Sequence, residues 1–153
     1  MMPIKKKASR SLAIIVSEFN PEITSLLLEG ALARLQERGL VLHDIKIVKV
    51  PGAIEIPLIA KLLAKSNKYQ ALICLGAVIR GETSHYDYVC SQVSYGCQQV
   101  MMHYELPVIF GVLTTDNEEQ ARARAGGKEG HKGREAADVA MTMMAVMQDL
   151  SFF

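Results

Sequence analysis

Residues 69–85, YQALICLGAVIRGETSH, decide the fold, because an uncharged apolar run here ends in a polar turn with a glycine. The apolar part, residues 69–79, is too short for the roughly 20 residues that cross a membrane as a helix. It is typical of a strand buried on both faces of a parallel sheet. Residues 85–104 then favour a helix, so the stretch forms a strand-turn-helix unit, and its strand is predicted to be central.

The same unit repeats along the chain. Residues 12–17 (LAIIVS) predict a strand, and residues 21 to about 38 predict a helix with Asn20 as its N-terminal cap and Gly39 at its C-terminal end. Further strands are expected at residues 44–50 and 107–114, and further helices at 54–65, 117–125 and 132–150. This order predicts an α/β fold: a three-layer αβα sandwich with a mainly four-stranded, parallel, flavodoxin-like sheet. Residues 126–133 are the only stretch expected to be irregular.

Composition limits the class of protein. The 153 residues are 50% hydrophobic and 22% charged, which predicts a single domain over residues 1–153, with residues 1–10 as a flexible or partner-docked arm. Seventeen Lys and Arg against sixteen Asp and Glu give a net charge of +1, which argues against nucleic-acid and membrane-surface partners. No secretory signal is recognisable.

Three cysteines are an odd number for a disulfide framework, and none are spaced Cys-x-x-Cys. They predict reduced thiols, a cytoplasmic location and no metal site. The four histidines show no metal-ligand spacing either. The sequence also lacks the Walker phosphate-binding motif, the dinucleotide fingerprint and the serine-hydrolase elbow.

Ligands of open α/β sheets bind beyond the carboxyl ends of the strands. Four polar segments are expected to meet there: residues 18–20, 51–55, 80–85 and 114–117. The Gly81–Ser84 turn precedes a helix, so its amides and hydroxyls could bind a phosphate. The alternative is an ordinary cap by Thr83 or Ser84, and the charge of Glu82 disfavours an anion.

His85 stands at the same helix start, where the helix dipole favours a neutral imidazole that can exchange protons. Its alternative is a packing role against Tyr86 or Tyr88. Phe19 is either a ligand platform or a core residue. Glu55 lies between apolar neighbours and requires a hydrogen-bond donor, which a nitrogen-rich ligand would supply.

Five motifs together resemble the lumazine synthase family over roughly residues 11–150. They are EFN at 18–20, PGAIEIP at 51–57, GAVIRGETSHYDYV at 76–89, FGVLT at 110–114 and RAGGKEGHKG at 124–133. The family more often has Phe where this chain has Ile54, and often has Asn where it has His131.

The resemblance implies a transferase of riboflavin biosynthesis that needs no cofactor. It joins two small-molecule substrates, 5-amino-6-(D-ribitylamino)uracil and 3,4-dihydroxy-2-butanone 4-phosphate, into 6,7-dimethyl-8-ribityllumazine, phosphate and water. His85 would be the catalytic residue that moves protons. Phe19 would stack on the pyrimidine, Glu55 would hold the ribityl hydroxyls, and the turn from Gly81 to Thr83 would bind phosphate with Arg124. The implied substrate-binding set is Phe19, Asn20, Ala53, Ile54, Glu55, Val78, Ile79, Gly81, Glu82, Thr83, Phe110, Arg124 and Lys132.

Two helical segments predict assembly from the residues alone. Residues 88–104 and 139–147 contain no Asp, Glu, Lys or Arg, whereas a monomer's surface helix keeps a charged face. The alternative is that Ser and Gln suffice as a solvent face. The family forms pentamers, often twelve of them in an icosahedral shell, and the short 124–133 segment favours the shell. In the family, Phe110, Arg124 and Lys132 reach a neighbour's pocket. Cys90 and Cys97 are then packing residues.

Two competing functions remain open from the sequence. One is a flavodoxin-like module that binds a flavin or phosphate at the same sheet edge. The other is a shell protein that has lost catalysis.

Overall fold

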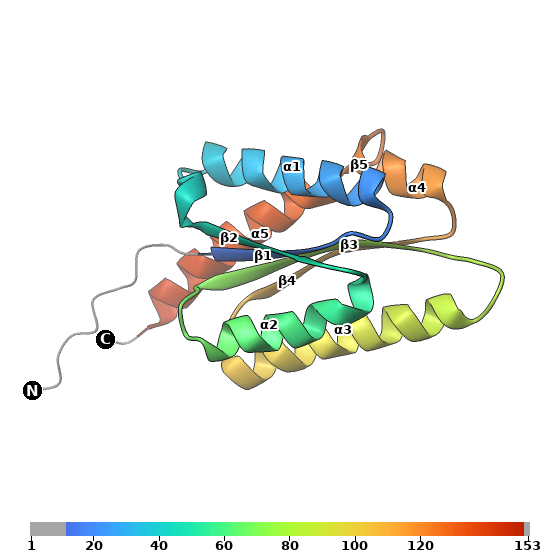
Figure 1. Cartoon of the computed structure of the whole chain (residues 1–153). Coiled ribbons are helices and arrows are strands. Elements are labelled where there is room, and N and C mark those ends of the chain that lie inside the picture. Colours follow the sequence, from blue (N-terminus) through green and yellow to red (C-terminus); the bar gives the residue numbers. More distant parts are fainter. Residues whose placement is uncertain (1–11, 152–153) are drawn as a thin grey trace, which may run out of the picture.

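A parallel four-stranded sheet forms the middle layer (Figure 1). The computed structural model describes residues 12–151, so the arm expected at residues 1–10 lies outside the described part. The strands are β1 (Leu12–Ser17), β2 (Ile45–Val50), β3 (Ala71–Ile79) and β4 (Val108–Thr115), in the order β2-β1-β3-β4. The prediction that residues 69–79 form a central strand is confirmed, and β1 is the other central strand.

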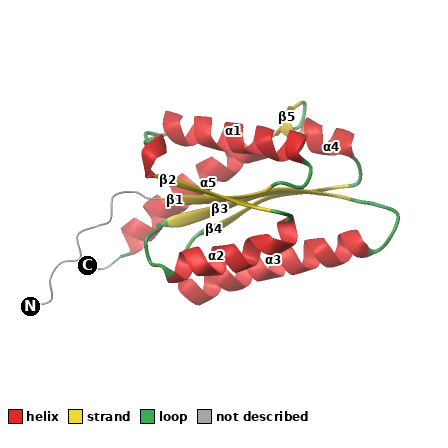
Figure 2. Ribbon diagram, viewed as in Figure 1, coloured by secondary structure: helices red, strands yellow, loops and turns green. Residues whose placement is uncertain are grey.

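Helices cover both faces of the sheet (Figure 2). On one face lie α1 (Pro21–Glu37), α4 (Glu118–Ala123) and α5 (Lys132–Leu150), and on the other lie α2 (Ile56–Lys65) and α3 (His85–Tyr104). The predicted three-layer sandwich is therefore confirmed. Gly39 has φ +94°, and its N–H bonds to Gln36 O, as expected just after the end of α1.

Strand alternation divides the core in two. Ile14 and Ile73 face α1 and α5, whereas Ile15 and Cys74 face α2 and α3. All four are fully buried, so the central strands have no solvent face. The pattern explains why the central strands β1 and β3 are apolar without alternation, whereas the edge strand β2 (IKIVKV) keeps exposed lysines.

The stretch expected to be irregular is a small hairpin. β5 (Ala125–Gly127) pairs antiparallel with β6 (Gly130–His131), and α5 begins at the next residue. Gly126 and Gly130 have φ of +104° and +93°, a conformation that L side chains rarely adopt. Single 3₁₀ turns precede β2 (Leu42–Asp44) and α2 (Ala53–Glu55).

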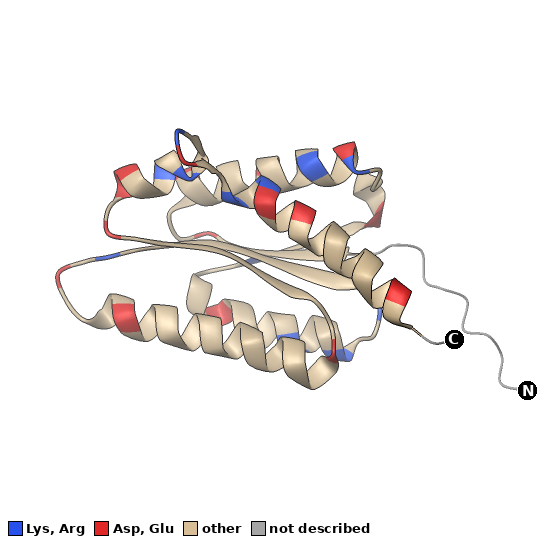
Figure 3. Cartoon of the chain, turned by 180° about the vertical axis from the view of Figure 1, so that it is seen from behind, with Lys and Arg blue, Asp and Glu red and all other residues tan. Residues whose placement is uncertain are grey.

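Charge is distributed unevenly between the layers. Figure 3 shows many charged positions on the layer of α1, α4 and α5 and few on the long helix of the opposite layer. Asp138 of α5 accepts from Arg34 of α1 and from Arg38, the residue just after α1, each at 2.8 Å, and Arg134 pairs with Glu37 at 2.8 Å. Among residues 12–151, no helix is long and apolar enough to span a membrane.

Candidate active site

The loop after β1 carries an aromatic ring on a fixed backbone. Glu18 N donates to Val50 O at 2.8 Å and Phe19 N donates to Pro51 O at 2.9 Å, which continues the contact with β2 beyond both strands. The Phe19 side chain is 71% exposed, so it is not a core residue. Stacking of a flat ligand on this ring would bury apolar surface.

Asn20 does not cap α1 as expected. It adopts the left-handed conformation (φ 62°, ψ 58°), and its side chain makes no capping bond. Instead, Nδ2 donates to Ala77 O of β3 at 3.0 Å. The pairing of β1 with β3 ends at Val16 and Leu75, so the Asn20 amide supplies a donor just beyond the last backbone pair. This bond joins the Phe19 loop to the central strand.

Glu55 has an unsatisfied carboxylate oxygen. It ends the 3₁₀ turn that begins at buried Ala53, while Ile54 is 43% exposed. The Glu55 Oε2 atom is buried, and no donor reaches it within residues 12–151. A Cβ at Gly52 would lie 3.3 Å from this oxygen, so the glycine leaves room beside it. A buried acceptor without a partner is costly, and a ligand hydroxyl would satisfy it.

The turn between β3 and α3 is open to solvent. Gly81, Glu82, Thr83 and His85 are all exposed. Thr83 Oγ1 accepts from His85 N at 3.3 Å, whereas the N-cap residue Ser84 makes no side-chain capping bond. A Cβ at Gly81 would meet nothing within 4 Å. The turn therefore has space for a small anion beside the start of α3.

Arg80 connects this turn to the neighbouring strand end. Its Nε donates to Asp116 Oδ1 at 3.1 Å, its Nη1 lies 3.5 Å from Asp87 Oδ1, and its guanidinium carbon lies 4.2 Å from the Tyr86 ring centroid. The backbone N–H of Arg80 also donates to Thr115 O at 2.9 Å. Through these contacts Arg80 joins β3, α3 and the loop after β4.

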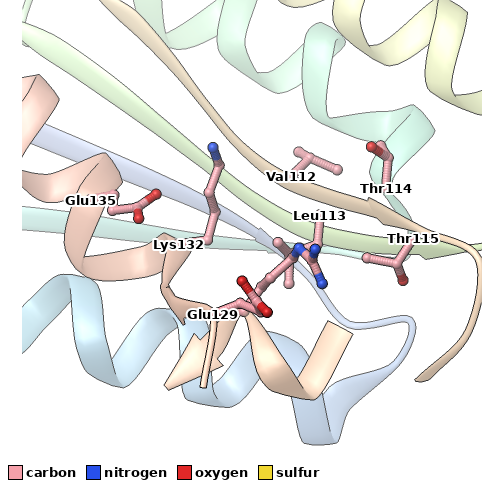
Figure 4. A pocket seen from close by; sticks show the side chains of 8 residues that line it. Val112, Leu113, Thr114, Thr115, Glu129, Lys132 and Glu135 are labelled. Atoms are coloured by element: carbon pink, nitrogen blue, oxygen red, sulfur yellow. The ribbon is translucent and has the colours of Figure 1, made fainter. Parts of the chain in front are cut away.

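Arg124 and Lys132 lie together in a pocket of about 280 Å³ beside the edge strand β4 (Figure 4). The lining residues are Val112, Leu113, Thr114, Thr115, Arg124, Glu129, Lys132 and Glu135. Arg124 Nη1 donates to Gln120 O at 3.1 Å. Neither Arg124 nor Lys132 forms an ion pair with another described residue, so both cations are available to an anionic ligand.

The predicted site residues thus fall into two groups. Phe19, Asn20, Glu55 and the Gly81–His85 turn follow β1, β2 and β3, and half-buried Val78 and Ile79 end β3. Asn20 and Ile79 line one hollow of about 300 Å³. Arg124 and Lys132 form the second group at β4, where Phe110 is half-buried against the α2 and α3 side.

Within residues 12–151, no cluster of three or more His, Cys, Asp or Glu side chains is arranged to hold a metal ion. The three cysteines are not among the predicted site residues. Cys74 and Cys97 are buried in the core, and burial raises the pKa of the Cys90 thiol.

The profile of the 6,7-dimethyl-8-ribityllumazine synthase family matches residues 9–148. The chain belongs to this family. Two 6,7-dimethyl-8-ribityllumazine synthases of Coxiella burnetii, from strains CbuG_Q212 and RSA 493 / Nine Mile phase I, are each 60% identical over 94% of this chain and 95% of their own length. That of strain Dugway 5J108-111 is 59% identical over the same shares.

Within this family member, sequence reasoning missed three supporting residues. Arg80 and Asp116 form an ion pair between the ends of β3 and β4, which only the folded structure brings side by side. His131 caps α5 with its ring, although histidine is not a usual capping residue. The available signal was the pair Gly30 and Gly133, since glycine inside or at the start of a helix often marks a close contact.

Proposed function

We propose that this chain condenses 5-amino-6-(D-ribitylamino)uracil with 3,4-dihydroxy-2-butanone 4-phosphate to give 6,7-dimethyl-8-ribityllumazine, phosphate and water. Membership of the lumazine synthase family supports the reaction. The observation that supports it most directly within the molecule is the buried, partnerless Glu55 Oε2, which suits a polyol hydroxyl as donor.

The first group of residues would bind the pyrimidine substrate. The exposed Phe19 ring would stack on the uracil, and Glu55 would accept from the ribityl chain. Asn20, Ala53, Ile54, Val78 and Ile79 would complete this part of the pocket. Because Nδ2 of Asn20 already uses one of its two N–H groups on Ala77 O, its second N–H and its Oδ1 are left for a ligand.

Phosphate would bind where the Gly81–Thr83 turn meets an arginine. The turn supplies amides and a hydroxyl, and the unpaired Arg124 guanidinium would supply bidentate bonds. Glu82 is exposed, so its carboxylate can stay in water.

His85 would carry protons through the reaction. The uracil amine attacks the ketone, an imine forms with loss of one water, phosphate leaves, and the ring closes with loss of a second water. Each step moves a proton, and a positioned histidine contributes about 10²- to 10⁴-fold to such transfers. Holding both substrates together can supply effective molarities on the order of 10⁵ M or more, so proximity outweighs the acid-base contribution.

The division of the site into two groups supports a site shared between subunits. Phe110, Arg124 and Lys132 lie at the edge strand β4 and would complete the pocket of a neighbour. The apolar faces support assembly as well, because Tyr88, Tyr95 and Met102 of α3 are 66–67% exposed. We propose a homopentamer, with twelve pentamers in an icosahedral shell, in the cytoplasm, where its free thiols stay reduced.

The deciding experiment incubates the purified chain with both substrates and follows lumazine fluorescence and phosphate release. Equimolar product and phosphate are expected, and omission of either substrate should abolish both. A folded assembly that yields neither product would be a silent shell protein. A yellow protein that binds flavin mononucleotide tightly without turnover would instead be a flavin-binding module.

A further inference from the structure

His131 holds the start of α5 through its imidazole ring. Nδ1 accepts from Gly133 N at 3.2 Å and from Arg134 N at 3.4 Å, so it caps two of the amides that have no partner within the helix. These bonds require an unprotonated Nδ1, and the proton of the neutral ring therefore sits on Nε2. The Leu26 carbonyl of α1 acts on this ring in the opposite sense, because it raises the pKa of His131.

The His131 ring fills a space that exists because two neighbouring residues, Gly30 and Gly126, have no side chain. A Cβ at Gly30 of α1 would lie 2.1 Å from Cε1 and 2.3 Å from Nε2, and a Cβ at Gly126 would lie 3.2 Å from Cδ2. At Gly133, a Cβ would lie 2.1 Å from Leu27 O. The two helices therefore approach so closely that the imidazole is clamped between α1 and the hairpin.

This clamp fixes the two cations of the β4 pocket. His131 pairs with Ala125 across the hairpin, and Lys132 N donates to Arg124 O at 2.8 Å. Arg124 and Lys132 directly flank this paired segment. Any change that breaks the contacts of the His131 ring with the start of α5 and with α1 would therefore loosen the backbone that positions Arg124 and Lys132.

Protonation is such a change. An Nδ1–H cannot accept from the Gly133 and Arg134 amides, and the added charge meets the positive end of the helix dipole. Burial and the Arg134 charge lower the pKa of His131, whereas the Leu26 carbonyl and Glu135 raise it less. Arg134 and Glu135 on α5 are the titratable groups that face the ring; α1 presents Leu26 O and Gly30, and β5 presents Gly126.

We propose that His131 is a positioning residue: its neutral ring holds Arg124 and Lys132 in place to bind the phosphorylated substrate, and its protonation releases them. The proposal rests on the proposed function, because it assigns the two cations to the phosphate. His131 touches no reacting atom. It acts through the backbone of the hairpin and of the first turn of α5.

The test compares wild type with His131→Asn and His131→Ala between pH 8 and pH 5.5. Asn can cap a helix but cannot titrate, so it separates capping from charge. At pH 8, His131→Asn should keep the KM for the butanone phosphate within about twofold, and His131→Ala should raise it about tenfold, as expected from loss of a cap. The KM for the pyrimidine and kcat should move less.

On acidification, the ratio of wild-type KM to His131→Asn KM for the butanone phosphate should rise about tenfold. A ratio removes the protonation of the substrate phosphate itself, which occurs near pH 6 in both measurements. His43→Asn, at an exposed histidine of the 3₁₀ turn before β2, is the matched control and should behave as wild type. A ratio that stays constant with pH, or a His131→Ala protein with a wild-type KM at pH 8, would overturn the proposal.

A second experiment does not depend on enzymatic activity. The pKa of His131 is lower in the folded chain than its ordinary value of about 6.5. Below about pH 6.5 the unfolded chain therefore binds more protons than the folded chain, and the stability that His131 provides decreases as the pH falls. The thermal midpoint of wild type should therefore drop relative to that of His131→Asn below about pH 6.5. Parallel midpoints would contradict the clamp even if the chain catalyses a different reaction, whereas diverging midpoints with no synthase activity would contradict only the proposed function.

Discussion

Asn20 Nδ2 donates to Ala77 O at 3.0 Å, and this bond ties the turn that carries Phe19 to the central strand β3. On β3 the acceptor Ala77 lies two residues beyond Leu75, which forms the last pair between β1 and β3 with Val16. The left-handed backbone at Asn20 aims the side chain across the sheet edge. An aromatic platform and the strand that leads to His85 are thereby held together.

Replacing Asn20 should therefore weaken binding of the pyrimidine. Asp and Gly both tolerate φ above zero, but neither can donate to Ala77 O. We expect Asn20→Asp and Asn20→Gly each to raise the KM for the pyrimidine about tenfold and to lower the free energy of unfolding by about 1–3 kcal/mol, the cost of an orphaned carbonyl. Steady-state kinetics and urea unfolding measure the two effects.

Asn67 supplies a matched control, because it also has a left-handed backbone (φ 60°) but lies after α2, at the opposite end of the sheet. Asn67→Gly should leave the pyrimidine KM unchanged. An Asn20→Asp enzyme with wild-type KM and stability would show that the bond to Ala77 has no such role.

Arg80 should matter for catalysis more than for stability. Its ion pairs with Asp87 and Asp116 are exposed, and such pairs contribute about 0–1 kcal/mol each. They nevertheless position the turn that bears His85. We expect Arg80→Met to lower kcat about tenfold while the free energy of unfolding changes by less than about 1 kcal/mol.

The exposed Arg122 pairs with Glu22 and Glu118 and provides the control. Arg122→Met should change stability as little as Arg80→Met does and should retain wild-type kcat. Equal kcat values for the two variants would remove Arg80 from the list of positioning residues.

The contact between α1 and α5 depends on two glycines. Gly→Ala inside a helix ordinarily stabilises by about 1 kcal/mol, but Gly30→Ala would strike the His131 ring and Gly133→Ala would strike Leu27 O. Both should lower the thermal midpoint. Adding His131→Ala should recover much of the loss for Gly30→Ala, because a side chain has been removed, and none for Gly133→Ala, because the obstacle is backbone. Equal recovery in both double variants would contradict this contact geometry.

The sequence predicted the periodic elements well and the tertiary contacts poorly. The helix at residues 85–104 and the strand at 12–17 have the predicted bounds, because apolar periodicity and flanking turn residues determine them locally. Asn20 is predicted as a helix cap because its residue type favours one, but in the structure its side chain donates to the distant Ala77 carbonyl on β3 instead. The β5–β6 hairpin escaped prediction, since its strands of three and two residues carry no periodicity.

The same distinction applies to the site. Phe19, Glu55 and His85 could be predicted as site candidates because each follows a strand and therefore lies at the carboxyl edge of the sheet. Arg80 and His131 were not assigned roles, because each also contacts a residue far away in the sequence: Asp116 lies 36 residues from Arg80, and Gly30 lies 101 residues from His131. Only the folded chain brings these partners within contact distance.

Arg124 should determine the affinity for phosphate. Inorganic phosphate is expected to inhibit competitively against the butanone phosphate, and Arg124→Ala should raise its inhibition constant about tenfold or more, since a guanidinium makes charge-assisted bidentate bonds. Arg124→Lys keeps the positive charge but loses the bidentate guanidinium, so its inhibition constant for phosphate should lie between those of wild type and Arg124→Ala. The unpaired state of Arg124 means that this substitution breaks no ion pair within the described chain. Unchanged phosphate inhibition in Arg124→Ala would remove this residue from the phosphate site.

The final prediction concerns a site shared between neighbouring subunits. His85→Ala should lower kcat about 10- to 1000-fold, and Arg124→Ala should weaken phosphate binding, so each variant alone is poorly active. If one subunit supplies His85 and its neighbour supplies Arg124, dissociating and reassembling a mixture of the two should recover activity. In a closed ring every subunit offers one donor and one acceptor edge, so some interfaces of a mixed ring pair an intact His85 with an intact Arg124.

For random mixing at equal amounts, about one interface in four carries both intact residues, so recovery to about a quarter of wild-type activity is expected. The double variant His85→Ala/Arg124→Ala reassembled with wild type is the control, because it yields the same fraction of intact interfaces from a different mixture. A site contained within one subunit predicts no recovery in the first mixture and about half of wild-type activity in the control. Sedimentation of the active species adds a separate check: a fully active monomer would contradict the shared site, and a free pentamer would contradict only the shell.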